Sequence, residues 1–317
     1  MRVSRWGAAA LAALLLATTG GCGEQAADTP AKDTAASASD LPATADGDGE
    51  MVPPLPALSD RPKLKRKATK AAKPRPAGRV FGADASWPQC PKGMGIPEKR
   101  TEGQPMPTEA AEFVVLGLTN GPSFVANPCL ESQVQWAKDR HLMVAAYSIV
   151  SYPDRRTLRD LGDQGPFPAD SRLGALRNVG YQAALYNLAT MRRAGLRTPV
   201  VWIDVEPVLH FDWSPDLRAN AAVVEGAARG YQDGGYRIGF YSLASLWSRV
   251  GGDLRTGAPE WRPAGSRGLA EALNRCGKDW SFQGGPAILG QWVEDNRDRN
   301  VTCPGAVTDL ALWFHQY

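Results

Sequence analysis

Two carboxylates at the end of one apolar run are the residues of this chain best placed for chemistry. The run covers residues 199–207 (PVVWIDVEP), and its apolar residues predict a buried β-strand. Because side chains alternate along a strand, we expect Asp204 and Glu206 on the same face. Carboxylates at the edge of an apolar core are costly, so the pair indicates acid/base chemistry, with one carboxyl protonated and the other ionised. The alternative is a strand end whose acids cap a helix or pair with Arg.

The amino terminus has the pattern of an export signal. A basic start precedes a short apolar segment, residues 8–17, and small residues then lead into Cys22. This order resembles a bacterial lipoprotein signal, which would make residues 1–22 a signal peptide and lipidate Cys22. We therefore expect an extracytoplasmic protein anchored to the cell membrane through Cys22. Thr19 stands where Leu is usual, so plain secretion is the alternative. No later apolar run approaches the roughly 20 residues of a membrane span.

Residues 23–78 are expected to form a disordered, charged linker. They contain no Phe, Trp, Tyr or Ile, and such a segment cannot bury enough apolar surface to offset its ordering entropy. The linker is acidic up to Asp60 and basic over 61–79. The basic part is interpreted either as a tether that touches anionic lipid or wall polymer, or as a solvated spacer. Export and a net charge of only +3 argue against nucleic acid as a partner.

The remaining residues, 79–317, have the length of one large α/β barrel domain. Helices are expected near 129–140, 173–194 and 217–231, between strand signals. Alternating strands and helices predict a parallel sheet with right-handed crossovers, and the strand count is close to the eight of a (β/α)8 TIM-type barrel. Seven strands are expected: 80–86, 113–118, 142–149, 199–205, 236–241, 288–293 and 310–317.

Active sites of such barrels lie at the carboxyl ends of the strands. Asp84, Asp204 and Glu206 all fall at such ends. Aromatic residues fall there too, and each taken alone would be core, but together at one barrel mouth they would form a sugar-binding surface. The candidates are Trp87, Tyr147, Tyr241, Trp292 and Trp313.

Four cysteines remain when Cys22 is set aside. An even number in an exported domain suggests two disulfides. Proximity in the sequence favours Cys90 with Cys129 and Cys276 with Cys303, although three pairings are possible. The chain has no Cys-x-x-Cys spacing and only three His, so neither a metal site nor another cofactor is expected.

Several short segments appear in the order found in a known family. They are 82–89 (GADASWPQ), 113–121 (FVVLGLTNG), 145–148 (AAYS), 201–206 (VWIDVE), 239–242 (GFYS), 291–293 (QWV) and 313–317 (WFHQY). Their order resembles glycoside hydrolase family 25, the lysozyme (muramidase) family, or its actinobacterial relatives. The resemblance spans residues 80–317 and implies a glycosidase-like barrel that acts on peptidoglycan or a related cell-envelope glycan. We expect the protein to be a monomer.

The resemblance also implies roles for the three acids. Glu206 would be the general acid that protonates the glycosidic oxygen, while Asp204 and Asp84 would orient the sugar or stabilise positive charge at C1. Crowding of like charges would raise at least one pKa. The alternatives are a carbohydrate-binding barrel without turnover and an envelope scaffold whose barrel is only a folded head.

Two departures from the family pattern bear on catalysis. The family has a further Asp on a final strand, whereas this sequence ends at Tyr317, so we expect a barrel that is incomplete or closed by another element, without that carboxylate. Glu294 or Asp295 would substitute for it, unless the run 294–298 consists of surface acids. Ser148 replaces the expected His, and its hydroxyl would offer a hydrogen bond to sugar but no charge change near neutral pH.

Overall fold

The computed structural model describes residues 78–317. The predicted signal peptide, the lipidation site at Cys22 and nearly all of the predicted linker lie outside these residues. Within them, no helix combines the length and apolar character needed to cross a bilayer.

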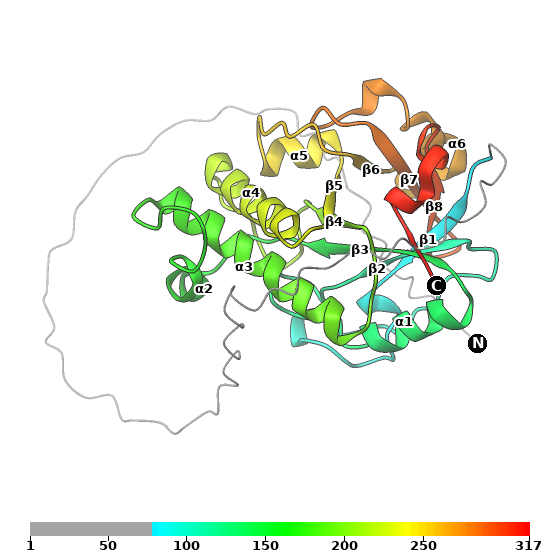
Figure 1. Ribbon diagram of the computed structural model, residues 1–317, viewed down its shortest axis with the longest axis horizontal. Helices are drawn as coiled ribbons and strands as arrows, with labels where there is room; N and C mark the ends of the chain where they lie inside the picture. Colours follow the sequence, from blue (N-terminus) through cyan, green and yellow to red (C-terminus); the bar gives the residue numbers. More distant parts are fainter. Residues whose placement is uncertain (1–77) are drawn as a thin grey trace, which may run out of the picture. The chain divides into compact units, whose positions relative to one another are not determined.

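Eight strands close into a barrel, which confirms the predicted fold class (Figure 1). The strands are β1 (Phe81–Ala85), β2 (Phe113–Gly117), β3 (Met143–Ile149), β4 (Val200–Asp204), β5 (Arg237–Tyr241), β6 (Glu260–Pro263), β7 (Ala287–Glu294) and β8 (Arg297–Thr302). Neighbours from β1 to β7 are parallel, whereas β8 is antiparallel to both β7 and β1. The barrel is therefore complete, and a hairpin strand closes it.

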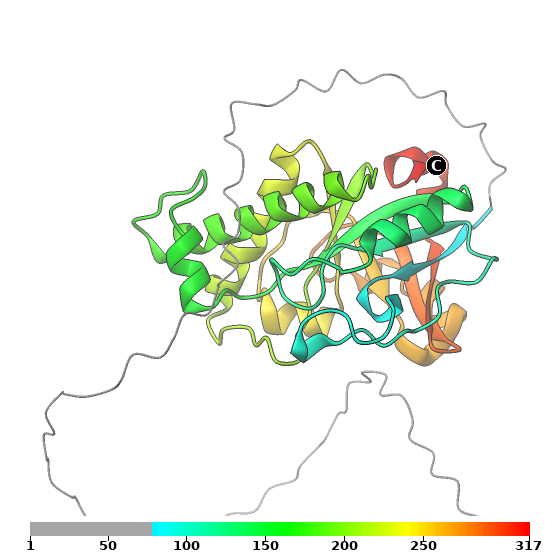
Figure 2. The same cartoon turned by 90° about the horizontal axis from the view of Figure 1, so that it is seen from below.

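Six α-helices and several short 3-10 turns surround the strands (Figures 1 and 2). The helices are α1 (Leu130–Asp139), α2 (Arg155–Leu161), α3 (Arg172–Arg193), α4 (Leu217–Asp233), α5 (Ala244–Val250) and α6 (Gly268–Asn274). The predictions near α1, α3 and α4 are confirmed. The other three helices have seven residues each, which is too short for a clear amphipathic period.

The longest helices, α3 and α4, lie side by side against the outer faces of the strands (Figures 1 and 2). Glycine permits their close approach. A Cβ at Gly180 would lie 2.0 Å from the carbonyl oxygen of Val223, and a Cβ at Gly226 would lie 1.9 Å from that of Arg177. The two backbones therefore touch where the side chains would otherwise hold them apart.

Inward side chains fill the barrel below its mouth. Trp202 on β4 occupies the interior, and Gly239 on β5 leaves room for it, since a Cβ there would lie 2.3 Å from the indole ring. Trp313 packs beside Trp202, with 6.2 Å between the ring centres, and Phe314 packs on Phe113. Phe113 starts β2, and Trp313 and Phe314 belong to the carboxyl-terminal segment that pairs with the start of β3, so they close the end of the barrel opposite the mouth.

The expected strand over 310–317 is wrong. A 3-10 turn, η6 (Ala306–Leu312), occupies its first part, and only β9 (His315–Gln316) is extended. β9 pairs with Met143 and Val144 at the start of β3, outside the barrel. The sequence prediction missed two strands, β6 and β8. β8 carries mostly charged and polar residues, and β6 alternates the charged Glu260 and Arg262 with Trp261 and Pro263.

Both predicted disulfides are confirmed. Cys90 pairs with Cys129 and ties the loop after β1 to the start of α1. Cys276 pairs with Cys303 and ties the segment after α6 to the end of β8.

The buried ion pair on β6, a strand that the sequence did not predict, can be tested by mutation. Glu260 is fully buried and accepts hydrogen bonds from Arg262 Nε (2.7 Å) and the backbone nitrogens of Gln283 and Gly285 (both 3.0 Å). Glu260→Gln should lower the free energy of unfolding by about 3–5 kcal/mol, because it leaves the buried Arg262 without its counterion. Urea unfolding measures this loss.

The matched control is Glu225→Gln, which breaks a solvent-accessible pair with Arg177 on α3. Such pairs contribute about 0–1 kcal/mol. Equal losses in the two variants would contradict the assignment of Glu260 as the anchor of this part of the barrel.

Candidate active site

Four carboxyl groups gather at the carboxyl-terminal mouth of the barrel. Asp84 lies near the end of β1, Asp204 ends β4, and Glu206 follows two residues later. Asp298 joins them from β8. Burial is the main cause that raises the pKa of Asp84, Asp204 and Glu206. The charge of Asp298 adds to the rise for Asp84 and Glu206, and the charges of Glu206 and Asp84 add to the rise for Asp204, as expected for acids at one strand end. The structure thus brings the three predicted acids together and adds a fourth.

The expectation that the barrel lacks a carboxylate on its last strand is wrong, because β8 carries Asp298. β8 runs antiparallel to its neighbours, so its first residues, not its last, lie at the mouth; Asp298 is in register with Val293 near the end of β7. The suggested substitutes do not join the site. Glu294 and Asp295 are exposed and form ion pairs with Arg299. The interpretation of residues 294–298 as surface residues is therefore confirmed for Glu294 and Asp295 and wrong for Asp298.

Asp84 is held by two side-chain amides. Its Oδ2 accepts hydrogen bonds from Gln291 Nε2 (2.9 Å) and Asn300 Nδ2 (2.6 Å). Each amide is oriented by a further donor: the Tyr241 hydroxyl donates to Gln291 Oε1 and Trp261 Nε1 donates to Asn300 Oδ1, both at 2.8 Å. With both amide oxygens occupied, the amide nitrogens face Asp84, so the network fixes this carboxyl as an acceptor.

Glu206 has the electrostatics of a general acid. Burial, followed by the negative charge of Asp298, raises its pKa from 4.5 to about 7, and the positive charge of Lys99 acts in the opposite direction. The side chain is only half-buried, so a substrate can reach it. Its backbone oxygen accepts a 2.9 Å hydrogen bond from Trp213 Nε1, which fixes the chain just beyond β4.

The two remaining acids are also harder to ionise than usual. Burial raises the pKa of Asp298 to about 6. Burial is the main cause that raises the pKa of Asp204 well above its ordinary value, and the charges of Glu206 and Asp84 add to the rise. Asp204 Oδ1 is buried without a hydrogen-bond partner in the described part of the chain. A buried acceptor left unpaired in this way is free to receive a donor from a bound molecule.

Three of the five predicted aromatic residues lie at the mouth. Tyr147 and Tyr241 are half-buried, and both pack edge-on against Trp261, with 5.7 and 4.7 Å between the ring centres. The acids Asp84 and Asp204 help to raise the pKa of both tyrosines, after burial as the main cause. Trp87 is half-buried in η2 (Trp87–Gln89), just after β1.

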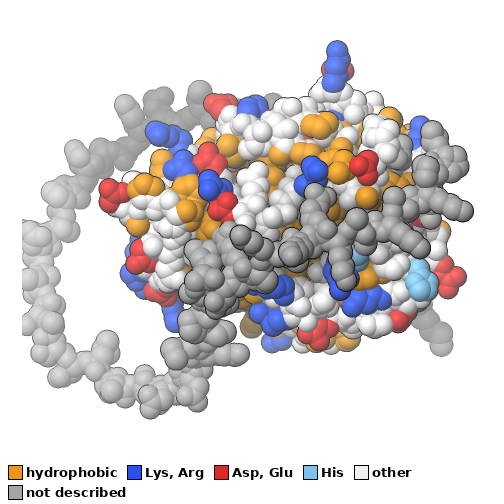
Figure 3. Space-filling view, in the orientation of Figure 1, with side chains coloured by type: hydrophobic (Ala, Val, Ile, Leu, Met, Phe, Trp, Pro, Cys, Tyr) orange, Lys and Arg blue, Asp and Glu red, His pale blue; other side chains and the backbone are white. Residues whose placement is uncertain are grey.

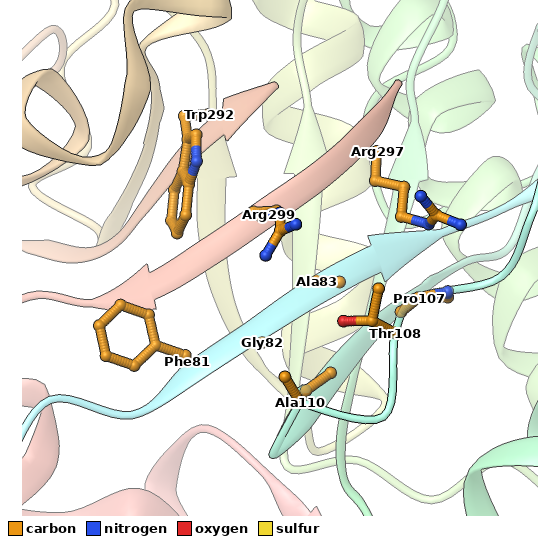
Figure 4. A pocket seen from close by; sticks show the side chains of 10 residues that line it. Phe81, Gly82, Ala83, Pro107, Thr108, Ala110, Trp292, Arg297 and Arg299 are labelled. Atoms are coloured by element: carbon orange, nitrogen blue, oxygen red, sulfur yellow. The ribbon is translucent and has the colours of Figure 1, made fainter. Parts of the chain in front are cut away.

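Trp292 and Trp313 do not lie at the mouth. Trp292 alternates with Gln291 along β7 and points outward, where it packs against Val301 and Ala272. Figure 4 shows it beside a surface groove of about 210 Å³ that Phe81 and Arg299 also line. Trp313 closes the opposite end of the barrel. The expectation that these two residues bind substrate is therefore wrong.

Ser148 is not positioned for sugar binding either. It follows Tyr147 on β3, so its side chain points out of the barrel, where it shares a 2.6 Å hydrogen bond with the Tyr231 hydroxyl of α4. Only 2% of Ser148 is exposed. Site residues that the sequence analysis did not find are Gln291, Asn300, Trp261, Asp298 and Lys99.

The face of the molecule in Figure 3 shows no evident bias toward one sign of charge. On the face shown in Figure 3, basic and acidic side chains are interspersed over the described residues. Among residues 78–317, no group of three or more His, Cys, Asp or Glu is arranged to hold a metal ion.

Comparisons with known proteins support the resemblance found in the sequence. No family model matches the chain. A curated protein from Dictyostelium discoideum, described as a probable GH family 25 lysozyme 4, is 41% identical over 64 residues, which is 20% of this chain. The resemblance to glycoside hydrolase family 25 is confirmed. The matched segment spans 29% of the length of that relative.

Two lysozymes are among the solved structures to which this chain shows some similarity. A bacterial lysozyme from Streptomyces coelicolor is 15% identical, covers 74% of this chain and 97% of its own, and has a TM-score of 0.44. A family GH25 lysozyme from Aspergillus fumigatus is 14% identical, covers 71% of this chain and 94% of its own, and has a TM-score of 0.42.

The electrostatic role of Asp298 can be tested without any substrate. Asp298→Asn removes the charge that raises the pKa of Glu206, so that pKa should fall below about 7. Carbon-13 NMR titration of the labelled Glu206 carboxyl measures it. The control is Asp295→Asn, which removes an exposed acid from the same hairpin. An unchanged Glu206 pKa in Asp298→Asn would contradict the four-carboxyl site.

Proposed function

We propose that the protein is an exported, lipid-anchored glycoside hydrolase that cleaves peptidoglycan or a related cell-envelope glycan. The observation that carries this proposal is Glu206, a reachable carboxyl with a pKa of about 7 among three further acids. A group with this pKa holds a proton at neutral pH in a large fraction of molecules and can release it during the reaction.

Glycoside cleavage needs both a proton donor and nearby negative charge. Glu206 is suited to protonate the glycosidic oxygen as the bond to C1 breaks. The oxocarbenium-like transition state carries positive charge, which the Asp298 carboxylate, with a pKa of about 6, is placed to stabilise. The carboxyl oxygens of Asp84 and Asp204, whose pKa values burial raises well above the ordinary value, are placed to orient the sugar. Within this arrangement Gln291 and Asn300 hold Asp84 in place through two hydrogen bonds.

The walls of the mouth suit a sugar ring. Tyr147, Tyr241 and Trp87 offer half-buried aromatic surface beside polar groups, and sugars present both apolar C–H faces and hydroxyls. The unpaired Asp204 Oδ1 offers an acceptor for a hydroxyl or amide of the bound glycan. Stacking on the rings would hold the sugar while the acids act on its glycosidic bond.

Three features support the cellular setting and the substrate class. The lipoprotein-like signal ending at Cys22 indicates export and membrane anchoring. Two disulfides in the barrel are typical of an oxidising, extracytoplasmic environment. The curated relative described as a GH25 lysozyme favours a glycan of the peptidoglycan class as substrate.

Glu206→Gln tests the proposal, because the amide keeps the shape of the side chain but cannot donate the acidic proton. Release of reducing ends from purified peptidoglycan should fall by about 100-fold or more. The matched control is Glu131→Gln, the same change on the exposed face of α1, which should leave the rate unchanged.

Circular dichroism of both variants checks that the fold is intact. Retained activity in Glu206→Gln would contradict the assignment of the general acid. A wild-type protein that binds glycan but releases no reducing ends would instead establish a carbohydrate-binding barrel without turnover.

A further inference from the structure

Lys99 is a cation fixed at the mouth of an otherwise acidic site. It ends the 3-10 turn η3 (Pro97–Lys99), in the long connection between β1 and β2. Its Nζ lies 5.8 Å from the centre of the Trp87 ring, and its charge reaches Glu206, whose pKa it lowers. Lys99 is half-buried. None of the ion pairs among the described residues includes it.

The loop that carries Lys99 is held in place from several directions. The Lys99 carbonyl oxygen accepts a 2.9 Å hydrogen bond from Asn120 Nδ2, and Asn120 Oδ1 accepts one of 3.0 Å from the Ile96 nitrogen. The Cys90–Cys129 disulfide anchors the start of the same loop. The backbone of Lys99 is thus built into the rim of the barrel and is not part of a free surface loop.

Glycine at position 121 leaves room for the lysine stem. A Cβ at Gly121 would lie 2.9 Å from Lys99 Cγ and 3.6 Å from the Phe211 ring, in the loop that follows Glu206. The stem therefore lies against the loop after β2, and the ammonium group lies over the Trp87 ring. Aromatic rings attract cations at this range, which helps to hold the ammonium group there.

We infer that Lys99 binds an anionic group, a carboxylate or a phosphate, carried by the glycan close to the bond that Glu206 cleaves. This inference rests on the proposed function and narrows its substrate class to acidic glycans. A half-buried ammonium without a carboxylate partner gains most from an incoming anion, since water is partly excluded from the pair. The four acids would repel the same anion, so Lys99 sets where on the sugar it is accepted.

Binding to full-length protein carrying Glu206→Gln tests the inference independently of turnover. The probes are three: a peptide-free tetrasaccharide of N-acetylglucosamine and N-acetylmuramic acid, whose lactyl groups are carboxylates; a neutral N-acetylglucosamine tetrasaccharide; and a glycerol phosphate oligomer. Adding Lys99→Met, which retains the stem but removes the charge, should weaken binding of the acidic tetrasaccharide about tenfold. Binding of the neutral one should stay within about twofold, and Lys99→Arg should restore part of the loss.

The matched control is Lys92→Met, which removes an exposed lysine from the same loop and should change no affinity. A loss confined to the phosphate oligomer would keep the anion site and identify phosphate as its ligand. Equal losses for acidic and neutral glycans, or no loss at all, would overturn the inference. A protein that shows the charge preference but cleaves no glycan would contradict only the proposed hydrolysis.

Discussion

The enclosure of four carboxyl groups in one barrel mouth is the constraint on which the rest of this structure depends. Removing such groups from water is costly, and crowding them adds repulsion. Protonation reduces this cost, since an uncharged carboxyl is easier to bury. Burial accordingly raises the pKa of Glu206 to about 7 and that of Asp298 to about 6. The same physical effect that makes the site unfavourable to build makes one of its acids a proton donor near neutral pH.

The surrounding residues then assign each acid a place. Amide donors from β7 and β8 fix Asp84, and their orientation depends in turn on Tyr241 and Trp261. Lys99 brings a single positive charge to the rim, opposite the influence of Asp298 on Glu206. The positions of these side chains depend on the strand order, which brings the ends of six strands together around one opening. These strands are β1, β4, β5, β6, β7 and β8.

The sequence was sufficient for the fold class, five parallel strands before β6 and both disulfides, because those rest on apolar runs and cysteine spacing. The sequence did not predict β8, and the reason is physical. The inward residues of that strand include Asp298 and Asn300, which face the polar mouth, so the strand shows no apolar alternation. The turn before it offered a usable signal: Asp295 and Asn296 both adopt positive φ, as residues of these types do in tight hairpins.

Trp292 shows the complementary error. Its position at the end of a strand suggested the mouth, but a shift of one residue along a strand reverses the face, and Gln291 takes the inward place. β6 was missed because it carries the charged residues Glu260 and Arg262, which in a sequence indicate an exposed segment. In the structure they form a buried ion pair on the outer face of the strand. In all three cases the residue types alone did not show which side chains are buried: Asn300 bonds to Asp84, Gln291 bonds to Asp84, and Glu260 pairs with Arg262 inside the protein.

The most direct test of the central claim is the pH dependence of glycan cleavage by the wild-type protein. If the raised pKa of Glu206 supplies the catalytic proton, the rate should fall as the pH increases through about 7, where that carboxyl loses its proton. It should also fall as the pH decreases through about 6, where Asp298 is protonated and its negative charge is lost. A rate that stays level from pH 6 to pH 9 would contradict the account.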